Sequence, residues 1–154
     1  MNGVDNIPWY QNLSIWSAFF AWTVAQAIKM TQIYLRTHRI DFRAFVSTGG
    51  MPSAHSAMAC GLATSVGLEA GFGSPLFAVT ACFASVVMFD AQSVRRAAGL
   101  QASLLNQIVE ELFHDHRFSQ HKLAELLGHT RLEVFFGMVS GVITALGVHA
   151  LLGP

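Results

Sequence analysis

Apolar residues along this chain fall into four long blocks separated by polar segments. The blocks run from about residue 13 to 35, 53 to 71, 75 to 90 and 132 to 152. A helix that crosses the hydrocarbon core of a bilayer needs about 20 mostly apolar residues, so we expect each block to be a transmembrane helix. The turn-rich sequence EAGFGS between the second and third blocks favours an antiparallel hairpin.

The segment between the last two blocks has a different pattern. From about residue 99 to 128, apolar residues recur at helical spacing opposite polar ones, as in Leu104, Leu105, Ile108 and Val109 against Asn106, Gln107, Glu110 and Glu111. This pattern predicts an amphipathic helix at the membrane interface or against the bundle. The predicted fold is therefore all-α, a single polytopic membrane domain of residues 1–154 with about four transmembrane helices and one amphipathic interfacial helix.

Composition supports a membrane protein. Of the 154 residues 53% are hydrophobic and only 12% are charged, whereas an ordinary soluble domain has roughly 25% charged residues. The net charge is zero, which leaves no basic field to attract nucleic acid. Four short spans enclose little volume, so a homodimer that completes the bundle is an alternative to a monomer.

The basic residues lie on one side of the predicted bundle. All nine Lys and Arg residues lie in or beside the two long loops, which follow the first and third blocks. The N-terminal tail, the turn at Gly71 and the C-terminus have none. Because loops rich in Lys and Arg stay in the cytoplasm, we expect both termini outside and both long loops in the cytoplasm.

Several ionisable residues lie at span ends on that same side, where a charged group is costly and usually functional. They are His55, Asp90, His129 and Glu133, and Lys29 approaches them from within the first block. Lys29 lies three residues from Gln26 and from Gln32, which predicts a polar stripe facing the bundle interior. The alternative is a lysine that merely extends its amino group to the interface.

Residues 47–57, STGGMPSAHSA, predict a turn followed by a helix start. Gly49 and Gly50 allow backbone conformations closed to other residues, and Ser53 is in position to cap the helix. His55 then lies in the first turn, where unbonded N–H groups and the helix dipole favour an anion. The alternative is a helix start with a histidine that happens to lie near the surface.

The segment GHTRLEV, residues 128–134, permits two interpretations. His129 and Glu133 are four residues apart and share a helix face. A carboxylate bonded to one imidazole nitrogen would leave the other as a base or nucleophile. Alternatively, Thr130 and Glu133 form a capping box at the helix start.

The segment DAQSVRRAAGLQ, residues 90–101, combines an acid with paired arginines. Arg95 and Arg96 would suit phosphate oxygens, although anchoring at the cytoplasmic face or binding of acidic headgroups explains them equally well. Asp90 closes the third block, where an acid needs a basic partner. The loop histidines His114, His116 and His121 have no second cluster of ligands beside them, so we expect no metal.

The motifs GGMPSAHSA, FDAQSVRRAAGLQA and LLGHTRLEVFFG resemble the divergent branch of the type 2 phosphatidic acid phosphatase superfamily, which is related to acid phosphatases and vanadium-dependent haloperoxidases. The resemblance runs from about residue 26 to 141. It implies a lipid phosphatase without cofactor or metal. We expect such a protein in the inner (plasma) membrane of a bacterium.

The resemblance also implies residue roles. His55, in Pro-Ser-Ala-His where the superfamily has Pro-Ser-Gly-His, would protonate the leaving oxygen. His129 would attack phosphorus and form a phosphohistidine, with Glu133 in place of an aspartate four residues later. Lys29 and Arg36 match the spacing of the superfamily's first motif, although Thr37 replaces its proline.

A further motif departs from the superfamily, because Leu123 occupies the position of an arginine. We infer that Arg95 or Arg96 replaces it, so the predicted phosphate-binding set comprises Lys29, Arg36, Ser53, Arg95 and Arg96, with Asp90 as an orienting group. Phosphatidylglycerophosphate and phosphatidic acid are the favoured substrates, since both are made on the cytoplasmic side. The alternative is a non-catalytic protein that binds, transports or scaffolds lipid phosphates on a degenerate phosphatase fold.

Overall fold

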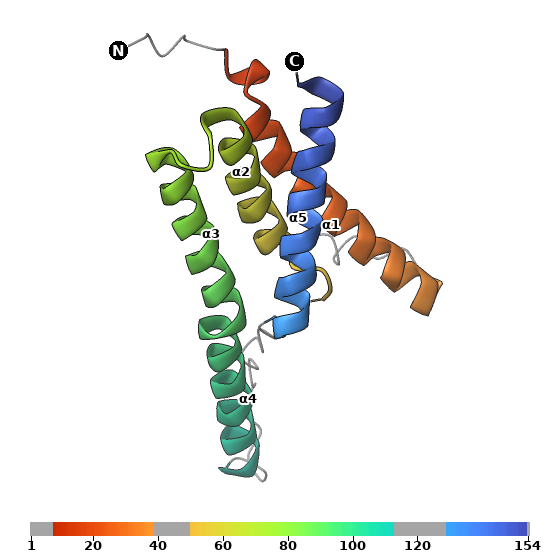
Figure 1. Ribbon diagram of the computed structural model, residues 1–154. Helices are drawn as coiled ribbons and strands as arrows, with labels where there is room; N and C mark the ends of the chain where they lie inside the picture. The colour runs from red at the N-terminus through yellow and green to blue at the C-terminus, as the bar shows by residue number, and fades with distance from the viewer. Residues whose placement is uncertain (1–7, 39–49, 113–128, 154) are drawn as a thin grey trace.

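The computed structural model describes residues 8–38, 50–112 and 129–153, and these residues are helical with no strand. A short 3-10 turn (Trp9–Gln11) precedes five helices: α1 (Leu13–Thr37), α2 (Ala54–Ala70), α3 (Pro75–Gln92), α4 (Val94–Leu112) and α5 (Arg131–Leu152). Helices α1, α2, α3 and α5 form a bundle, and α4 continues from α3 beyond one end of it (Figure 1). The all-α prediction is confirmed.

The helices of the bundle begin where the sequence supplies caps. The side chains of Asn12, Ser53, Ser74 and Thr130 each accept a hydrogen bond from the backbone N–H three residues further on. The bounds of the four bundle helices lie within two residues of the ends of the four apolar blocks. How deeply each helix lies in a membrane stays a prediction.

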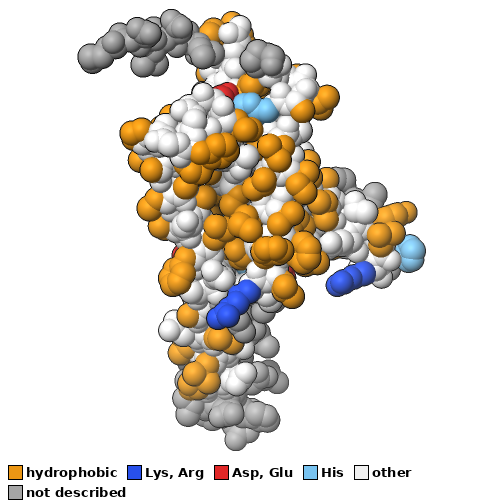
Figure 2. Space-filling view, in the orientation of Figure 1, with side chains coloured by type: hydrophobic (Ala, Val, Ile, Leu, Met, Phe, Trp, Pro, Cys, Tyr) orange, Lys and Arg blue, Asp and Glu red, His pale blue; other side chains and the backbone are white. Residues whose placement is uncertain are grey.

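The outer surface of the bundle is apolar. Large hydrophobic side chains are exposed on every bundle helix, and Figure 2 shows them across the visible face, with Lys and Arg side chains toward the end from which α4 projects. By length and composition, two stretches could cross a membrane: Pro75–Val109, which joins α3 to most of α4, and Arg131–Leu152. This surface suits lipid rather than water.

The amphipathic helix begins earlier than residue 99. Only Ser93 separates α3 from α4, and α4 starts at Val94, so the segment that the sequence assigns to residues 99–128 is already helical five residues before. The 18 residues of α3 cover about 27 Å, close to the roughly 30 Å hydrocarbon core of a bilayer. Helix α3 is therefore long enough for one span, and that α4 leaves the membrane at its end stays a prediction. Residues 113–128 lie outside the described part of the chain.

Small residues bring α2 and α5 into close contact. A Cβ atom added at Gly137 would lie 2.4 Å from the Ser53 carbonyl oxygen, and one added at Gly141 would lie 2.2 Å from the Ala57 carbonyl oxygen. Two glycines four residues apart share one helix face and let two backbones approach, as in many transmembrane helix pairs. This contact holds the second and third turns of α5 against the start of α2.

A hydrogen-bonded chain joins three helices at the end of the bundle that holds the C-terminus. Glu69 Oε2 lies 2.8 Å from Ser14 Oγ, Ser14 Oγ lies 3.1 Å from Ser65 Oγ, and Ser65 Oγ lies 2.7 Å from His149 Nε2. An ionised Glu69 can only accept. Ser14 then donates to Glu69, Ser65 donates to Ser14, and His149 donates from Nε2. Sequence periodicity alone did not single out His149.

Candidate functional site

His129 and Glu133 form a hydrogen-bonded pair at the start of α5. His129 Nδ1 lies 3.1 Å from Glu133 Oε2, and the His129 side chain is buried. The same Glu133 oxygen accepts a hydrogen bond of 2.9 Å from the Thr130 N–H, and Glu133 N–H donates to Thr130 Oγ1 at 3.3 Å. The capping box and the His–Glu pair therefore coexist. Because Nδ1 is held by the carboxylate, Nε2 is the imidazole nitrogen that could react.

Backbone hydrogen bonds bring the three motif segments together. The N–H of His129 donates to the carbonyl oxygen of Ala91 at 3.0 Å, near the end of α3. The N–H of Ser53, the N-cap of α2, donates to the carbonyl oxygen of Glu133 at 2.9 Å. Residues distant in sequence thus meet at one end of the bundle, as the motifs predict.

The start of α2 is held by serine hydroxyls. Ser53 Oγ accepts from the N–H of Ser56 at 3.4 Å and lies 3.0 Å from Ser56 Oγ, and both side chains are fully buried. Gly50, three residues before Ser53, has a positive φ of 94°, which favours glycine. Ser53 thus caps a helix, and its contact with a phosphate stays a prediction. His55 is exposed in the first turn of α2.

A pocket of about 260 Å³ lies between the starts of α2 and α5 and the end of α3. Its titratable lining residues are His55, Asp90 and His129, and the remaining lining residues are Val86, Val87 and Ala91. We call it the histidine pocket. It unites both histidines predicted to act in catalysis, and Asp90 is half-buried beside them.

A second pocket of about 220 Å³ lies between α1 and the start of α5. It is lined by Lys29, Gln32, Ile33, Arg36, Gly50, Met51 and Glu133, and we call it the cationic pocket. The polar stripe of α1 does face the interior, since Gln26 and Lys29 are 5% and 4% exposed. Two cations and one acid in a partly enclosed space make this pocket suitable for a phosphate group.

The single site expected from the sequence is thus divided between two pockets. Lys29 and Arg36 line one pocket, whereas His55, Asp90 and His129 line the other. The Glu133–His129 pair connects them, because Glu133 lines the cationic pocket and bonds to His129. The sequence had no signal for this division, which depends on how α1 and α3 flank α5.

The side chains of other predicted site residues lie outside the described part of the structure. Arg95 and Arg96 fall in the first turn of α4, but their side chains lie outside the described part of the structure, so their contact with phosphate stays a prediction. His114, His116 and His121 also lie outside it. Among the described residues, no three His, Cys, Asp or Glu side chains form a group that could hold a metal ion.

Comparison with known proteins identifies relatives over nearly the whole chain. The pattern of the divergent PAP2 family, named for type 2 phosphatidic acid phosphatases, matches residues 10–144. An uncharacterized membrane protein, YuiD of Bacillus subtilis (strain 168), is 42% identical over 149 aligned positions, and the match covers 88% of this chain and 92% of the relative. No solved structure shows significant similarity. The resemblance carried by the three motifs is confirmed, and membrane localisation is supported by this relative and by the apolar helices.

Proposed function

The chain belongs to the divergent PAP2 family, and we propose that it is a membrane lipid-phosphate phosphatase that works through a phosphohistidine. The observation that carries the proposal is the 3.1 Å contact between His129 Nδ1 and Glu133 Oε2, with His55 lining the same pocket as His129. Transfer of a phosphoryl group to a side chain requires a nucleophile that is oriented by a hydrogen-bond partner. It also requires a second group that protonates the leaving oxygen.

The first step of the proposed reaction forms the phosphoenzyme. His129 Nε2 attacks phosphorus and an N–P bond forms while the P–O bond to the lipid breaks. Protonated His55 donates its proton to the departing oxygen, which leaves as a lipid alcohol. Glu133 stabilises the positive charge that develops on the His129 ring through Nδ1–H. In the second step His55 takes a proton from water, the resulting hydroxide breaks the N–P bond, and inorganic phosphate is released.

Lys29 and Arg36 supply positive charge for the substrate. Both line the cationic pocket, and Glu133, which also lines it, bonds to His129. We propose that these side chains hold phosphate oxygens or a second acidic group of the headgroup, with Ser53, Asp90 and one of Arg95 or Arg96 completing the site. Phosphatidylglycerophosphate and phosphatidic acid are the proposed substrates.

The membrane arrangement belongs to the same proposal. The concentration of Lys and Arg in the two long loops favours a site on the cytoplasmic face, with both termini outside the plasma membrane of a bacterium. Phosphatidylglycerophosphate and phosphatidic acid are both available on that face. Their chains would lie in the bilayer while the phosphate reaches the bundle end.

One observation favours a second candidate function. Lys29 and Arg36 line a different pocket from the two histidines, so a lipid phosphate could be held at these cations without reaching His129. The chain would then bind, transport or scaffold lipid phosphates without turnover.

A single purified preparation distinguishes the two functions. Phosphate release from phosphatidylglycerophosphate and phosphatidic acid is measured in detergent without added metal, beside binding of the same lipids. The enzyme should release phosphate, and His129→Ala should abolish release while binding persists. His38→Asn is the matched control, because His38 ends α1 with a positive φ that asparagine tolerates. Binding without release by the wild-type protein would favour the second candidate.

A further inference from the structure

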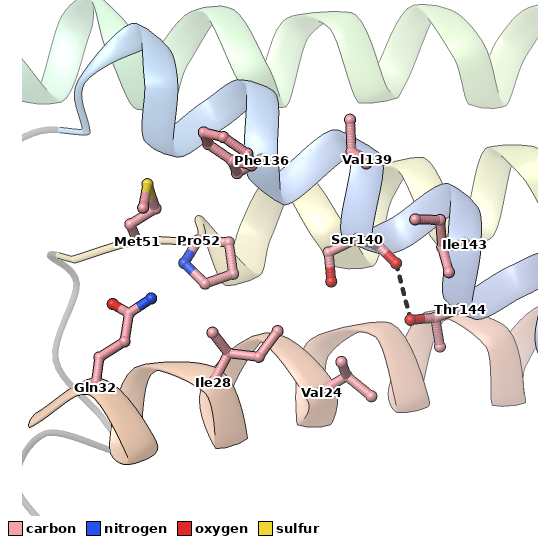
Figure 3. A pocket seen from close by; sticks show the side chains of 10 residues that line it. All are labelled: Val24, Ile28, Gln32, Met51, Pro52, Phe136, Val139, Ser140, Ile143 and Thr144. Carbon is pink, nitrogen blue, oxygen red and sulfur yellow. Dashed lines mark hydrogen bonds between the residues drawn. The ribbon is translucent and has the colours of Figure 1, made fainter. Parts of the chain in front are cut away.

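An apolar groove runs between α1 and α5 beside the cationic pocket (Figure 3). Its volume is about 350 Å³, within the range of small-ligand sites. Helix α1 contributes Val24, Ile28 and Gln32, the segment before α2 contributes Met51 and Pro52, and α5 contributes Phe136, Val139, Ser140, Ile143 and Thr144. Two helices thus form the walls, and Met51 and Pro52 lie toward one end.

The walls of the groove offer little to a polar ligand. Thr144 Oγ1 donates to the carbonyl oxygen of Ser140 at 2.8 Å (Figure 3), so this hydroxyl is bonded within its own helix. The other polar residues that line the groove are Gln32 and Ser140. Ile28 and Ile143 are 38% and 64% exposed, so the groove opens onto the apolar outer surface of the bundle.

The groove and the cationic pocket share part of their lining. Gln32 and Met51 line both, so an apolar path along α1 leads to Lys29 and Arg36. The α1 residues that line the two hollows run from Val24 to Arg36, which are about 18 Å apart along the helix. One elongated molecule with an apolar tail and an anionic head therefore fits both hollows at once.

We propose that this groove holds one hydrocarbon chain of a lipid whose phosphate binds in the cationic pocket. The proposal rests on the lipid-phosphate specificity of the proposed function. In a bilayer such a chain only exchanges one hydrocarbon environment for another, so the groove contributes little hydrophobic driving force. It instead sets the direction in which the headgroup enters, which aligns the phosphate with Lys29 and Arg36.

Photo-crosslinking tests the occupant directly. The probe is phosphatidic acid that carries a diazirine midway along one acyl chain, added to the full-length protein in phosphatidylcholine nanodiscs. Crosslinks should concentrate on residues 24–28 and 139–144. Excess unlabelled phosphatidic acid should remove them, whereas diacylglycerol with the same chains should not. A separate arm with a prenyl phosphate as competitor tells whether the chain must be acyl.

A tryptophan substitution tests the role of the groove in specificity. Ile143→Trp fills the groove, whereas Leu146→Trp places the same side chain at an exposed position on α5 outside its lining. Ile143→Trp should lower the yield of crosslinks to residues 24–28 about tenfold, because the chain can no longer lie along the groove, and should leave binding of a short-chain soluble analogue within about twofold. Leu146→Trp should leave both unchanged.

The outcomes separate this proposal from the proposed function. If the wild-type protein releases no phosphate but the phosphate-dependent crosslinks remain in the groove, the groove stands and the phosphatase fails. If phosphate is released while crosslinks scatter evenly over the exposed helices, the groove is wrong and the phosphatase stands. Crosslinks that diacylglycerol removes as well as phosphatidic acid would also overturn the proposal, because they would indicate ordinary surrounding lipid.

Discussion

Gly137 lies so close to the start of α2 that its substitution by alanine should destabilise the protein. In Gly137→Ala the new Cβ would lie 2.4 Å from the Ser53 carbonyl oxygen, whereas Cβ contacts under 3.0 Å are essentially never seen. The two helices must therefore separate by at least 0.6 Å, the difference between these distances. The oxygen is backbone and already accepts from Ala57 N–H at 3.0 Å, so it cannot rotate away.

The expected cost follows from two opposing effects. Overpacking of this kind destabilises a protein by about 1–3 kcal/mol. Replacing glycine by alanine within a helix recovers up to about 1 kcal/mol, which leaves a net loss of up to about 2 kcal/mol. Because Ser53 N–H bonds to the Glu133 carbonyl oxygen, the shift should also reach the His129–Glu133 pair and lower phosphate release.

The matched control lies on the same helix. A Cβ at Gly147 meets nothing within 4 Å, so Gly147→Ala should unfold at the same or a higher denaturant concentration than the wild-type protein. Unfolding is followed by circular dichroism as sodium dodecyl sulfate is added to detergent micelles, and phosphate release is measured on the same samples. If Gly137→Ala were as stable and as active as Gly147→Ala, the close α2–α5 contact would be wrong.

Three further predictions concern single side chains. Ser65→Ala removes the hydroxyl that links Ser14 to His149 and should lower the free energy of unfolding by about 0.5–2 kcal/mol in the same unfolding assay. Phosphate release should not change, because these hydrogen bonds lie at the other end of the bundle. A loss of activity at full stability would contradict that placement. Glu133→Gln keeps an oxygen for the helix cap but removes the charge, so kcat should fall more than stability, and an unchanged kcat would show that the carboxylate serves the cap alone. Lys29→Met should raise KM for lipid substrates more than it lowers kcat, and equal KM values would remove Lys29 from the binding site.

Features that depend on near neighbours were predictable from the sequence. The four apolar blocks match the bundle helices because length and hydropathy decide them, and the caps at Ser53 and Thr130 act only on the next turn of the chain. The boundary between α3 and α4 was not marked by the periodicity. Amphipathic periodicity becomes clear only after Gly99, whereas the helix already begins at Val94.

Features set by helix crossing were not predictable. The motifs indicated that Lys29, His55, His129 and Glu133 would meet, but not that His55 and Lys29 would line different pockets. That division depends on which face of α1 meets α5, and the crossing depends in turn on close contacts such as the one at Gly137. The two interpretations of GHTRLEV also looked exclusive in the sequence, whereas one oxygen of Glu133 serves both.

The central claim is that His129 carries the phosphoryl group during turnover. The protein is mixed with phosphatidic acid labelled with ³²P in its phosphate, quenched within the first turnover in alkali and digested for peptide mapping. The label should lie on His129 as an acid-labile, alkali-stable phosphoramidate, and His129→Ala should show neither label nor phosphate release. Phosphate release that persists in His129→Ala, or a wild-type protein that releases phosphate without label on His129, would contradict the account.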